Sequence, residues 1–206
     1  MTENRDSFLT RLHDLPGSVI FSEDESARIE LAYDLSKEAH RWQKRKDGTR
    51  YFEHPRRSTL TLIDRLHVYD VACIIAMLLH DGYEDSPRHV TPVKVEILGG
   101  PEAARIIRLV SKRPKEGYAD RLLRLADWKS LVVKLCDRHD NLSDLDSSPA
   151  AFKEKQFLET RDVYLPIFDR LVAIVPEMHR EAVTGLVLEV QQLVAGGLLG
   201  LAIASS

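Results

Sequence analysis

The sequence predicts an all-α fold, because helical periodicity dominates it and the alternation typical of β-strands is nearly absent. Most glycine and proline residues fall between the periodic segments, where they break helices. With 206 residues, of which 44% are hydrophobic and 30% charged, the chain has the balance of an ordinary soluble globule and is long enough to bury a core. We therefore expect one domain over residues 1–206.

The first expected helix opens at Ser22, where Glu25 three residues later completes a capping-box pattern. Its apolar positions repeat at helical spacing, at Ile29, Ala32, Leu35 and Ala39. The polar segment RKDGTR (45–50) ends this helix and forms a loop. A second helix is expected after His54-Pro55, since proline suits the first helical turn.

Residues 69–81 are apolar almost all round, which predicts a central, buried helix. Thr91-Pro92 starts a short helix that ends near Gly99-Gly100, and an amphipathic helix follows at 101–112. After the breakers Pro114 and Gly117, helices are expected at 118–127, 129–142, 149–173 and 177–195. The motifs discussed below lie in a core of about residues 22–146, and the helices at 149–195 complete the domain.

Neither end of the chain predicts a membrane segment. The polar N-terminus MTENRDSFLTRLHDL lacks the apolar core of a signal peptide, and no uninterrupted apolar stretch reaches the roughly 18 residues of a spanning helix. The C-terminal LVAGGLLGLAIASS is short and broken by glycine, so we expect a packed or frayed tail, with a partner-binding segment as the alternative. The amphipathic C-terminal helices leave a homo-oligomer open.

The net charge indicates what kind of molecule the chain binds, and the cysteines indicate the redox state of its compartment. The formal net charge of -3 gives no reason to expect a nucleic-acid or anionic-membrane surface, whereas a local basic pocket can still hold a phosphorylated small molecule. Cys73 and Cys136 both lie in apolar runs, so we expect buried thiols in a reducing cytoplasm. Trp42 and Trp128 could stack on a base, but packing is the commoner role and is the one we expect.

Polar groups at the ends of two apolar runs indicate a metal site. ACIIAMLL runs directly into His80-Asp81, and LVVKLC runs into Asp137. A buried carboxylate needs a compensating charge, which one shared divalent cation would supply. Imidazole and carboxylates suit transition metals such as manganese, iron, zinc or nickel, and His54 is a plausible fourth ligand.

Two further carboxylates follow the His-Asp pair. Glu84 and Asp85 lie one turn beyond His80-Asp81 and would face the same cavity, where they could orient water or move a proton. Each feature alone has an ordinary explanation: a His-Asp dipeptide occurs by chance, single histidines are usually surface or core residues, and an acidic pair often ends a helix. The conjunction of these residues in apolar helices is specific and predicts metal-dependent phosphoester hydrolysis.

At this point the sequence resembles the HD superfamily of metal phosphohydrolases, whose pattern is H…HD…D. More narrowly, it resembles the hydrolase domain of the RelA/SpoT alarmone enzymes and their small stand-alone relatives. The blocks that carry the resemblance are AHRWQKRKDGTRYFEHP (39–55), AMLLHDGYEDS (76–86), ILGGPEAARIIRLVSKRP (97–114) and KLCDRHDNLSDL (134–145).

The resemblance implies a role for each matching residue. His54, His80, Asp81 and Asp137 would be manganese ligands, although another divalent transition metal is possible. Glu84 and Asp85 would form the catalytic acidic pair. Arg45 would contact the purine base with Lys46 nearby, and Asn141 would lie near the ribose. The implied reaction removes pyrophosphate from the 3′ position of guanosine tetra- or pentaphosphate, and the chain after residue 146 is too short for that family's synthetase domain.

Three pairs of adjacent residues depart from the family pattern. Gly82-Tyr83 stand where small aliphatic residues are usual, His139-Asp140 replace a leucine-histidine pair, and Ser143-Asp144 replace a basic residue and threonine. Gly82 could loosen the helix past the metal, and the acidic residues could disfavour extra phosphates. These changes support an alternative substrate: an adenosine alarmone, the 2′-phosphate of NADPH or a nucleoside phosphate. A non-catalytic nucleotide-binding module is the third hypothesis, which a missing metal ligand would have favoured.

Overall fold

The computed structural model describes residues 5–15 and 21–204, where the regular elements are helices apart from one isolated bridge between Lys44 and Arg50. The α-helices are α1 (Arg5–His13), α2 (Glu23–Ala39), α3 (Glu53–Leu60), α4 (Val71–Asp85), α5 (Pro92–Val110), α6 (Tyr118–Leu125), α7 (Trp128–Ser143), α8 (Ala150–Glu159), α9 (Leu165–Ile174) and α10 (Glu177–Ala204). A π-helical turn, Thr61–Arg65, extends α3, and another, Thr160–Tyr164, joins α8 to α9. The predicted all-α class is therefore confirmed.

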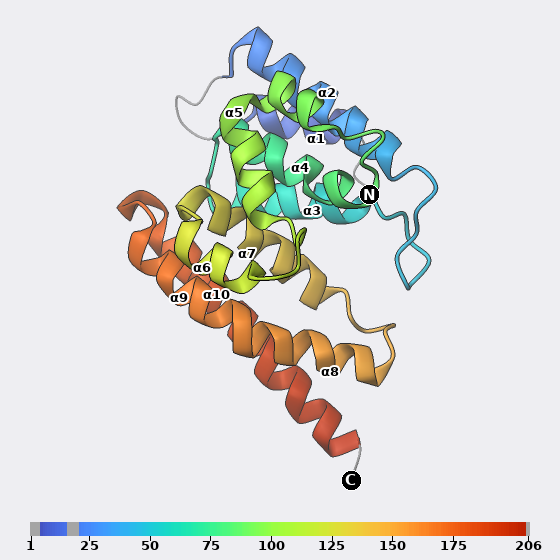
Figure 1. Cartoon of the computed structure of the whole chain (residues 1–206), viewed down its shortest axis with the longest axis vertical. Helices are drawn as coiled ribbons and strands as arrows, with labels where there is room; N and C mark the ends of the chain where they lie inside the picture. Colours follow the sequence, from blue (N-terminus) through green and yellow to red (C-terminus); the bar gives the residue numbers. More distant parts are fainter. Residues whose placement is uncertain (1–4, 16–20, 205–206) are drawn as a thin grey trace.

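Helix α4 lies at the centre of the fold (Figure 1) and packs against α2, α3, α5 and α7. Its residues 72–79 are all buried, as the predicted central helix requires. The helix begins where the side chain of Asp70 accepts a hydrogen bond from the backbone N–H of Cys73 at 2.9 Å. It continues to Asp85, so the polar residues after the apolar run lie on its last turn.

Two predicted helix boundaries have clear local causes. Ser22 and Glu25 form a complete capping box, with the Glu25 N–H donating to Ser22 Oγ at 3.2 Å and the Ser22 N–H donating to Glu25 Oε2 at 2.8 Å. The helices predicted on either side of Gly99-Gly100 are the two arms of α5. Gly100 kinks it with a φ of 71°, a left-handed conformation that glycine adopts without strain.

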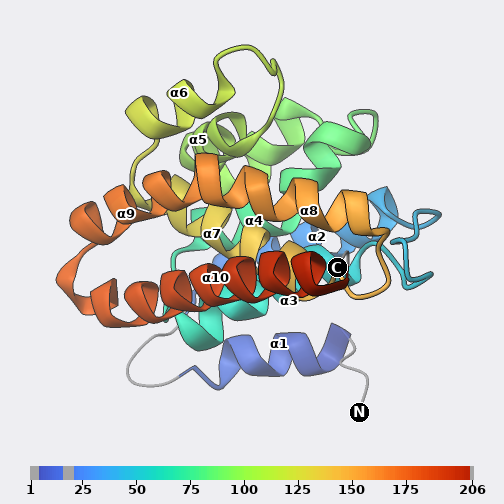
Figure 2. The ribbon, with the colours of Figure 1, turned by 90° about the horizontal axis from the view of Figure 1, so that it is seen from below.

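Helices α8, α9 and α10 form the second half of the molecule. Figure 2 shows α8 and α9 end to end, with α10 running antiparallel beside them, and all three lie close to α7. The single helix predicted at 149–173 is thus two helices joined by a π-helical turn. The cysteines predicted to be buried thiols, Cys73 and Cys136, are both buried and free.

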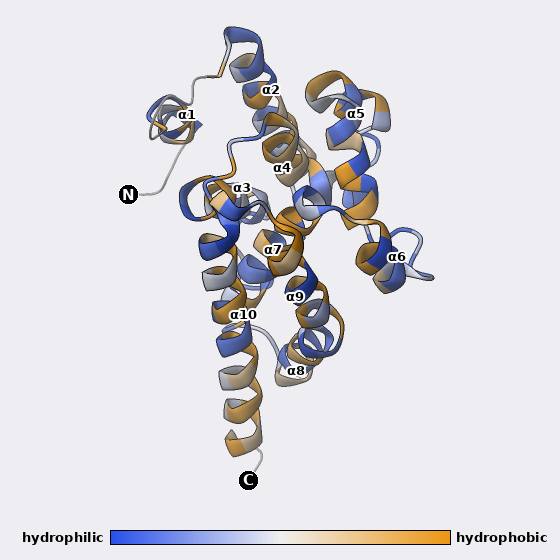
Figure 3. Ribbon diagram, turned by 90° about the vertical axis from the view of Figure 1, so that its left-hand side faces the viewer, coloured by the Kyte–Doolittle hydropathy of each residue, from blue (hydrophilic) through white to orange (hydrophobic). Residues whose placement is uncertain are grey.

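The C-terminal tail is the largest departure from the predicted boundaries. Instead of breaking at its glycines, α10 stays helical to Ala204 and projects beyond the rest of the molecule (Figure 3). Val194 is buried, whereas Leu199 and Ile203 are 63% and 68% exposed. By length and composition alone α10 could cross a membrane, which is weak evidence for a single helix. Its buried residues lie between His179 and Val194.

Two smaller differences from the sequence predictions remain. The helix Arg5–His13, which buries Phe8 and Leu12, lies in a segment for which no element was predicted. The packing role expected of Trp42 is wrong, since this side chain is 87% exposed. Trp128 does pack, stacking on the imidazole of His179 with ring centroids 5.6 Å apart.

Gly82 permits close packing just beyond the His-Asp pair, and α4 remains helical through it. A Cβ atom at Gly82 would lie 2.7 Å from Val90 Cγ2. We expect Gly82→Ala to cost about 1–3 kcal/mol through overpacking, more than the 0.5–1 kcal/mol that alanine gains in a helix. Gly185→Ala is the matched control, because a Cβ there meets nothing within 4 Å. Urea unfolding should show lower stability for Gly82→Ala only; equal stability of the two variants would contradict this packing.

Candidate metal centre and active site

The four predicted metal ligands come from three helices that meet beside the centre of the fold. His54 lies on the first turn of α3, His80 and Asp81 lie near the end of α4, and Asp137 lies in α7. Because α3, α4 and α7 pack against one another, residues up to 83 positions apart in sequence are brought into contact. Three of the four are buried, and Asp81 is partly exposed.

The donor atoms of these residues converge. One atom each from His54, His80 and Asp137 lie within 4.8 Å of one another. His54 Nε2 is 3.1 Å from Asp137 Oδ1 and 3.3 Å from Asp81 Oδ2. His80 Nε2 is 3.2 Å from Asp81 Oδ1. Three of the four predicted ligands therefore offer atoms to one point, and Asp81 contacts both histidines beside it.

The orientation of His80 suits a metal ligand. Its Nδ1–H donates to the backbone carbonyl of Met77 at 2.8 Å, which directs Nε2 toward the carboxylates. Although buried, Nε2 has no hydrogen-bond partner among the described residues. An unpaired buried nitrogen is costly, and imidazole whose second nitrogen is held by a carbonyl is a common form of metal ligand.

The electrostatics of the centre favour a cation. Burial raises the pKa of Asp137, but Lys134, His54 and His80 outweigh burial and lower it well below the ordinary value. Burial lowers the pKa of His54, but hydrogen bonds to Asp137 and Asp140 raise it to about 9. Positive charge is therefore strongly stabilised at the point where the four side chains meet.

The C-terminal end of α4 carries negative charges, which the helix dipole disfavours there. Asp81, Glu84 and Asp85 all lie in its C-terminal turns, where cations are normally stabilising. Asp81 accepts a hydrogen bond from the hydroxyl of Tyr51 at 3.1 Å. Such an accumulation of carboxylates is a cost to stability that a bound cation would offset.

Glu84 and Asp85 differ in their surroundings. Glu84 Oε1 accepts a hydrogen bond from the backbone N–H of Lys112 at 2.8 Å, which ties it to the segment after α5. No hydrogen bond involves the Asp85 carboxylate among the described residues. Burial, together with the charges of Asp81 and Glu84, raises the pKa of Asp85 above its ordinary value. Asp85 therefore lacks the backbone contact that holds Glu84.

The predicted substrate-contacting residues lie beside the metal centre. Asn141 Nδ2 donates to Asp137 Oδ1 at 2.6 Å, and Arg45 Nη2 donates to Asn141 Oδ1 at 3.2 Å. Arg45 and Asn141 line a cavity of about 240 Å³ that also reaches Tyr51, and none of the four metal-ligand candidates lines it. Lys46 lines its far side, with Nζ 2.7 Å from the ring centroid of Phe152.

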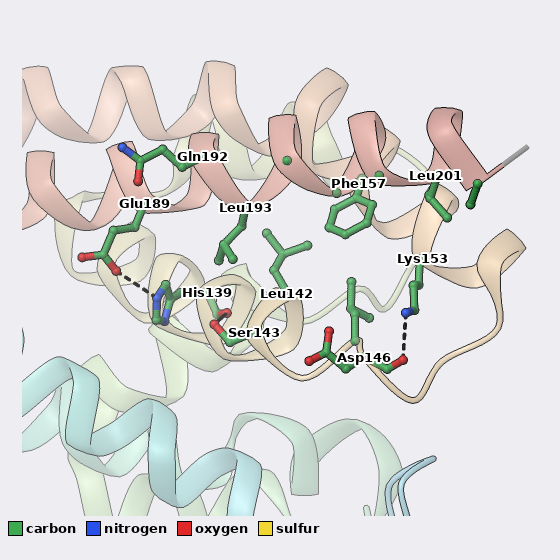
Figure 4. Close-up of a pocket in the computed structure, with 15 residues that line it drawn as sticks. His139, Leu142, Ser143, Asp146, Lys153, Phe157, Glu189, Gln192, Leu193 and Leu201 are labelled. Atoms are coloured by element: carbon green, nitrogen blue, oxygen red, sulfur yellow. Dashed lines mark hydrogen bonds and ion pairs between the residues drawn. The ribbon is translucent and has the colours of Figure 1, made fainter. Parts of the chain in front are cut away.

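A larger cavity, of about 830 Å³, lies elsewhere. It is formed by the end of α7, α8 and the projecting half of α10, and Figure 4 shows its apolar walls, including Leu142, Phe157 and Leu193. None of the metal-ligand candidates lines it. Although this cavity is larger, it is therefore not the candidate catalytic pocket.

The sequence interpretation missed several residues that contact the site. Lys134 Nζ lies 2.7 Å from Asp137 Oδ2, one helical turn before it, and the lysine inside the apolar run LVVKLC was an available signal. Tyr51 was missed as a partner of Asp81. Asp140 and Arg57 reach the site through His54, and neither had a local signal: Asp140 departs from the family pattern, and Arg57 lies after the matching block 39–55.

The donor set fits a divalent transition metal. Two imidazole nitrogens and two carboxylates form a mixed N/O set that leaves coordination positions open, and the unpaired Nε2 of His80 points into it. Arg45 and Asn141 line the smaller cavity beside this centre, and Glu84 and Asp85 lie on the last turn of α4. The arrangement combines the parts that metal-assisted hydrolysis requires.

The chain belongs to the HD domain family, whose sequence model matches residues 32–173. That range contains the whole ligand set and every predicted substrate contact. The predicted HD fold and the resemblance to RelA/SpoT-type hydrolase domains are therefore confirmed.

The relatives found among characterised proteins are alarmone enzymes. The chain is 34% identical over 157 residues to GTP pyrophosphokinase rsh of Brucella melitensis, covering 70% of this chain and 20% of that protein. It is 29% identical over 161 residues to the bifunctional (p)ppGpp synthase/hydrolase SpoT of Escherichia coli K12, covering 72% and 22%. It is 34% identical over 152 residues to guanosine-3′,5′-bis(diphosphate) 3′-pyrophosphohydrolase of Aquifex aeolicus, covering 69% and 21%. The chain spans about a fifth of the length of these relatives.

A solved structure supports the fold. A metazoan ortholog of SpoT, reported to hydrolyse ppGpp and to play a role in starvation responses, superimposes with a TM-score of 0.60 at 23% identity. The match covers 87% of this chain and 98% of the other. At this identity the similarity establishes the shared helical fold.

Proposed function

We propose that this chain hydrolyses the 3′-pyrophosphate of guanosine tetra- or pentaphosphate, yielding GDP or GTP and pyrophosphate. The observation that carries the proposal is the convergence of His54, His80, Asp81 and Asp137 beside Glu84 and Asp85 in a member of the HD family. The relatives that bear names of this activity support the choice of substrate. We propose manganese as the native metal, in a cytoplasmic enzyme that acts on a free nucleotide.

The proposed chemistry divides among the residues of the site. A divalent cation held by the two histidines and two aspartates would lower the pKa of water and polarise a phosphoryl oxygen. Asp85 would accept the proton of the attacking water, while Glu84 would hold the segment at Lys112 in place. Asn141 would orient the ribose beside Asp137, and Arg45 would hold the base in the adjacent cavity. Lys46 would add positive charge at the rim.

Asp144, one of the acidic residues that depart from the family pattern, is paired with two arginines. Asp144 Oδ2 is 2.7 Å from Arg45 Nε and 3.0 Å from Arg57 Nη2. Its charge is therefore compensated, which weakens the argument that it repels a highly phosphorylated substrate. The pairing thus removes one argument for a less charged nucleotide as the substrate.

The raised pKa of Asp85 predicts how kcat falls at low pH. The proposed base must be deprotonated, so activity present at neutral pH should fall as the pH decreases through this raised pKa. At saturating metal, the acid limb of kcat should therefore lie above the pKa of about 3.9 of an ordinary aspartate. A limb at or below the ordinary aspartate value would contradict the assignment of Asp85.

A substrate panel tests the proposed function. Guanosine tetraphosphate, its adenosine counterpart and NADPH would be incubated with the metal-loaded protein, and pyrophosphate and orthophosphate would be measured separately. We expect pyrophosphate from guanosine tetraphosphate at the highest kcat/KM. Orthophosphate from NADPH alone would instead establish a 2′-phosphatase. Nucleotide binding without turnover at any metal would establish a binding module.

A further inference from the structure

Asp140 contacts the metal-ligand candidate His54 from the side opposite the metal centre. The two side chains are buried, and His54 Nδ1 lies 2.6 Å from Asp140 Oδ2. The other ring nitrogen, Nε2, faces Asp81 and Asp137. Asp140 lies one turn after Asp137 on α7, so a single helix supplies both a proposed metal ligand and a carboxylate behind another ligand.

Arg57 holds Asp140 in this position. Its Nε donates to Asp140 Oδ1 at 2.7 Å and its Nη2 donates to Asp140 Oδ2 at 3.0 Å, which is a two-point contact. Asp144 also accepts a hydrogen bond from Arg57 Nη2 at 3.0 Å, which fixes the guanidinium from the other side. The Asp140 carboxylate therefore has little freedom to rotate away from His54.

We propose that Asp140, held by Arg57, is a positioning residue that fixes His54 as a metal ligand through Nε2. A carboxylate that accepts the Nδ1–H of imidazole selects the tautomer with its lone pair on Nε2, orients the ring and strengthens it as a donor. The two-point contact with Arg57 holds the Asp140 carboxylate where it can accept the hydrogen bond from His54 Nδ1. The inference rests on the proposed metal centre and assigns no contact between Asp140 and substrate.

The arrangement depends on a position that departs from the RelA/SpoT-type pattern. Asp140 occupies the position where the RelA/SpoT-type pattern usually has histidine, and a histidine there is no anionic acceptor. An aspartate introduced alone would be a buried charge without a partner, and Arg57 supplies that partner from α3. The alternative is a purely structural ion pair between α3 and α7. That alternative predicts reduced folding stability without a change in the metal affinity of the folded protein.

The test compares two aspartates that share Arg57. Asp140→Ala removes the contact to His54, whereas Asp144→Ala removes the second partner of Arg57 and the partner of Arg45 but no contact to His54. The dissociation constant for Mn²⁺ would be measured on metal-free protein from the electron paramagnetic resonance signal of free Mn²⁺. We expect Asp140→Ala to weaken binding by about 10–100-fold, as for other residues behind a ligand, and Asp144→Ala by about threefold or less. Binding by Asp140→Ala within threefold of the wild type, or equal losses in both variants, would overturn the proposal.

A spectroscopic measurement covers the case in which Asp140→Ala does not fold. In the wild-type protein loaded with diamagnetic Zn²⁺, ¹⁵N-edited spectra of the histidine rings should show a proton on Nδ1 of His54 and none on Nε2. Asp140→Asn, which preserves the side-chain volume, should shift that Nδ1–H resonance. A zinc-bound His54 protonated at Nε2 would contradict the proposal. Because both experiments measure metal binding without nucleotide, they separate this inference from the choice of substrate; wild-type protein that binds neither metal would refute the metal centre as well.

Discussion

Asp137→Asn should abolish hydrolysis, lowering kcat/KM by about 1,000-fold or more. The asparagine keeps the volume but removes the charge that faces both His54 and Lys134. Loss of a carboxylate ligand should weaken metal binding, and metal catalysis contributes several kcal/mol of transition-state stabilisation, so a loss of this size is expected. Lys134 would also be left buried opposite a neutral group, which should destabilise the fold by about 3–5 kcal/mol.

Three measurements separate these effects. Steady-state hydrolysis of guanosine tetraphosphate gives the activity, Mn²⁺ titration gives the metal affinity, and urea unfolding gives the stability. Asp146→Asn is the matched control, because Asp146 is exposed and lies outside the cavity beside the metal centre. We expect that control to behave like the wild type. An active Asp137→Asn protein with unchanged metal affinity would be incompatible with Asp137 as a ligand.

Asp85→Asn should lower kcat by about 100- to 10,000-fold, the range for loss of a positioned general base. Asp85 is outside the proposed ligand set, so Mn²⁺ affinity should stay within a few-fold of the wild type. KM should also change little, because Asp85 lies apart from the cavity lined by Arg45 and Asn141.

Glu84→Gln is the matched control for Asp85→Asn. Its amide oxygen can still accept the hydrogen bond from the Lys112 backbone N–H, so we expect a smaller loss of kcat. Single-turnover rates at saturating metal measure both variants without a contribution from product release. A greater loss for Glu84→Gln than for Asp85→Asn would reverse the assignment of the base.

The helices could be predicted where the local sequence determines them. The capping box at Ser22, the apolar run of α4 and the glycine kink at Gly100 all depend on residues within a few positions of one another. The C-terminal helix was predicted too short because glycine costs only about 1 kcal/mol in a helix. Packing offsets that cost: Val194 is buried, and Gly197 lies against the ring of Phe157.

Part of the candidate site could also be predicted, because the local sequence marks some of its residues. His80 and Asp137 each end or interrupt an apolar run, so their burial was visible in the sequence. The contact between Asp140 and His54 joins positions 86 residues apart, and nothing in either local segment indicates it. Trp42 shows the converse, since a large apolar residue in a loop has no helix face to bury it.

The central claim is that one divalent cation binds where α3, α4 and α7 meet. Anomalous diffraction from crystals grown with Mn²⁺ tests this most directly, since it locates the metal independently of activity. We predict one strong peak within coordination distance of His54 Nε2, His80 Nε2 and the carboxylates of Asp81 and Asp137. A fully formed site without a peak at saturating Mn²⁺, or a peak only at other carboxylates, would contradict the account.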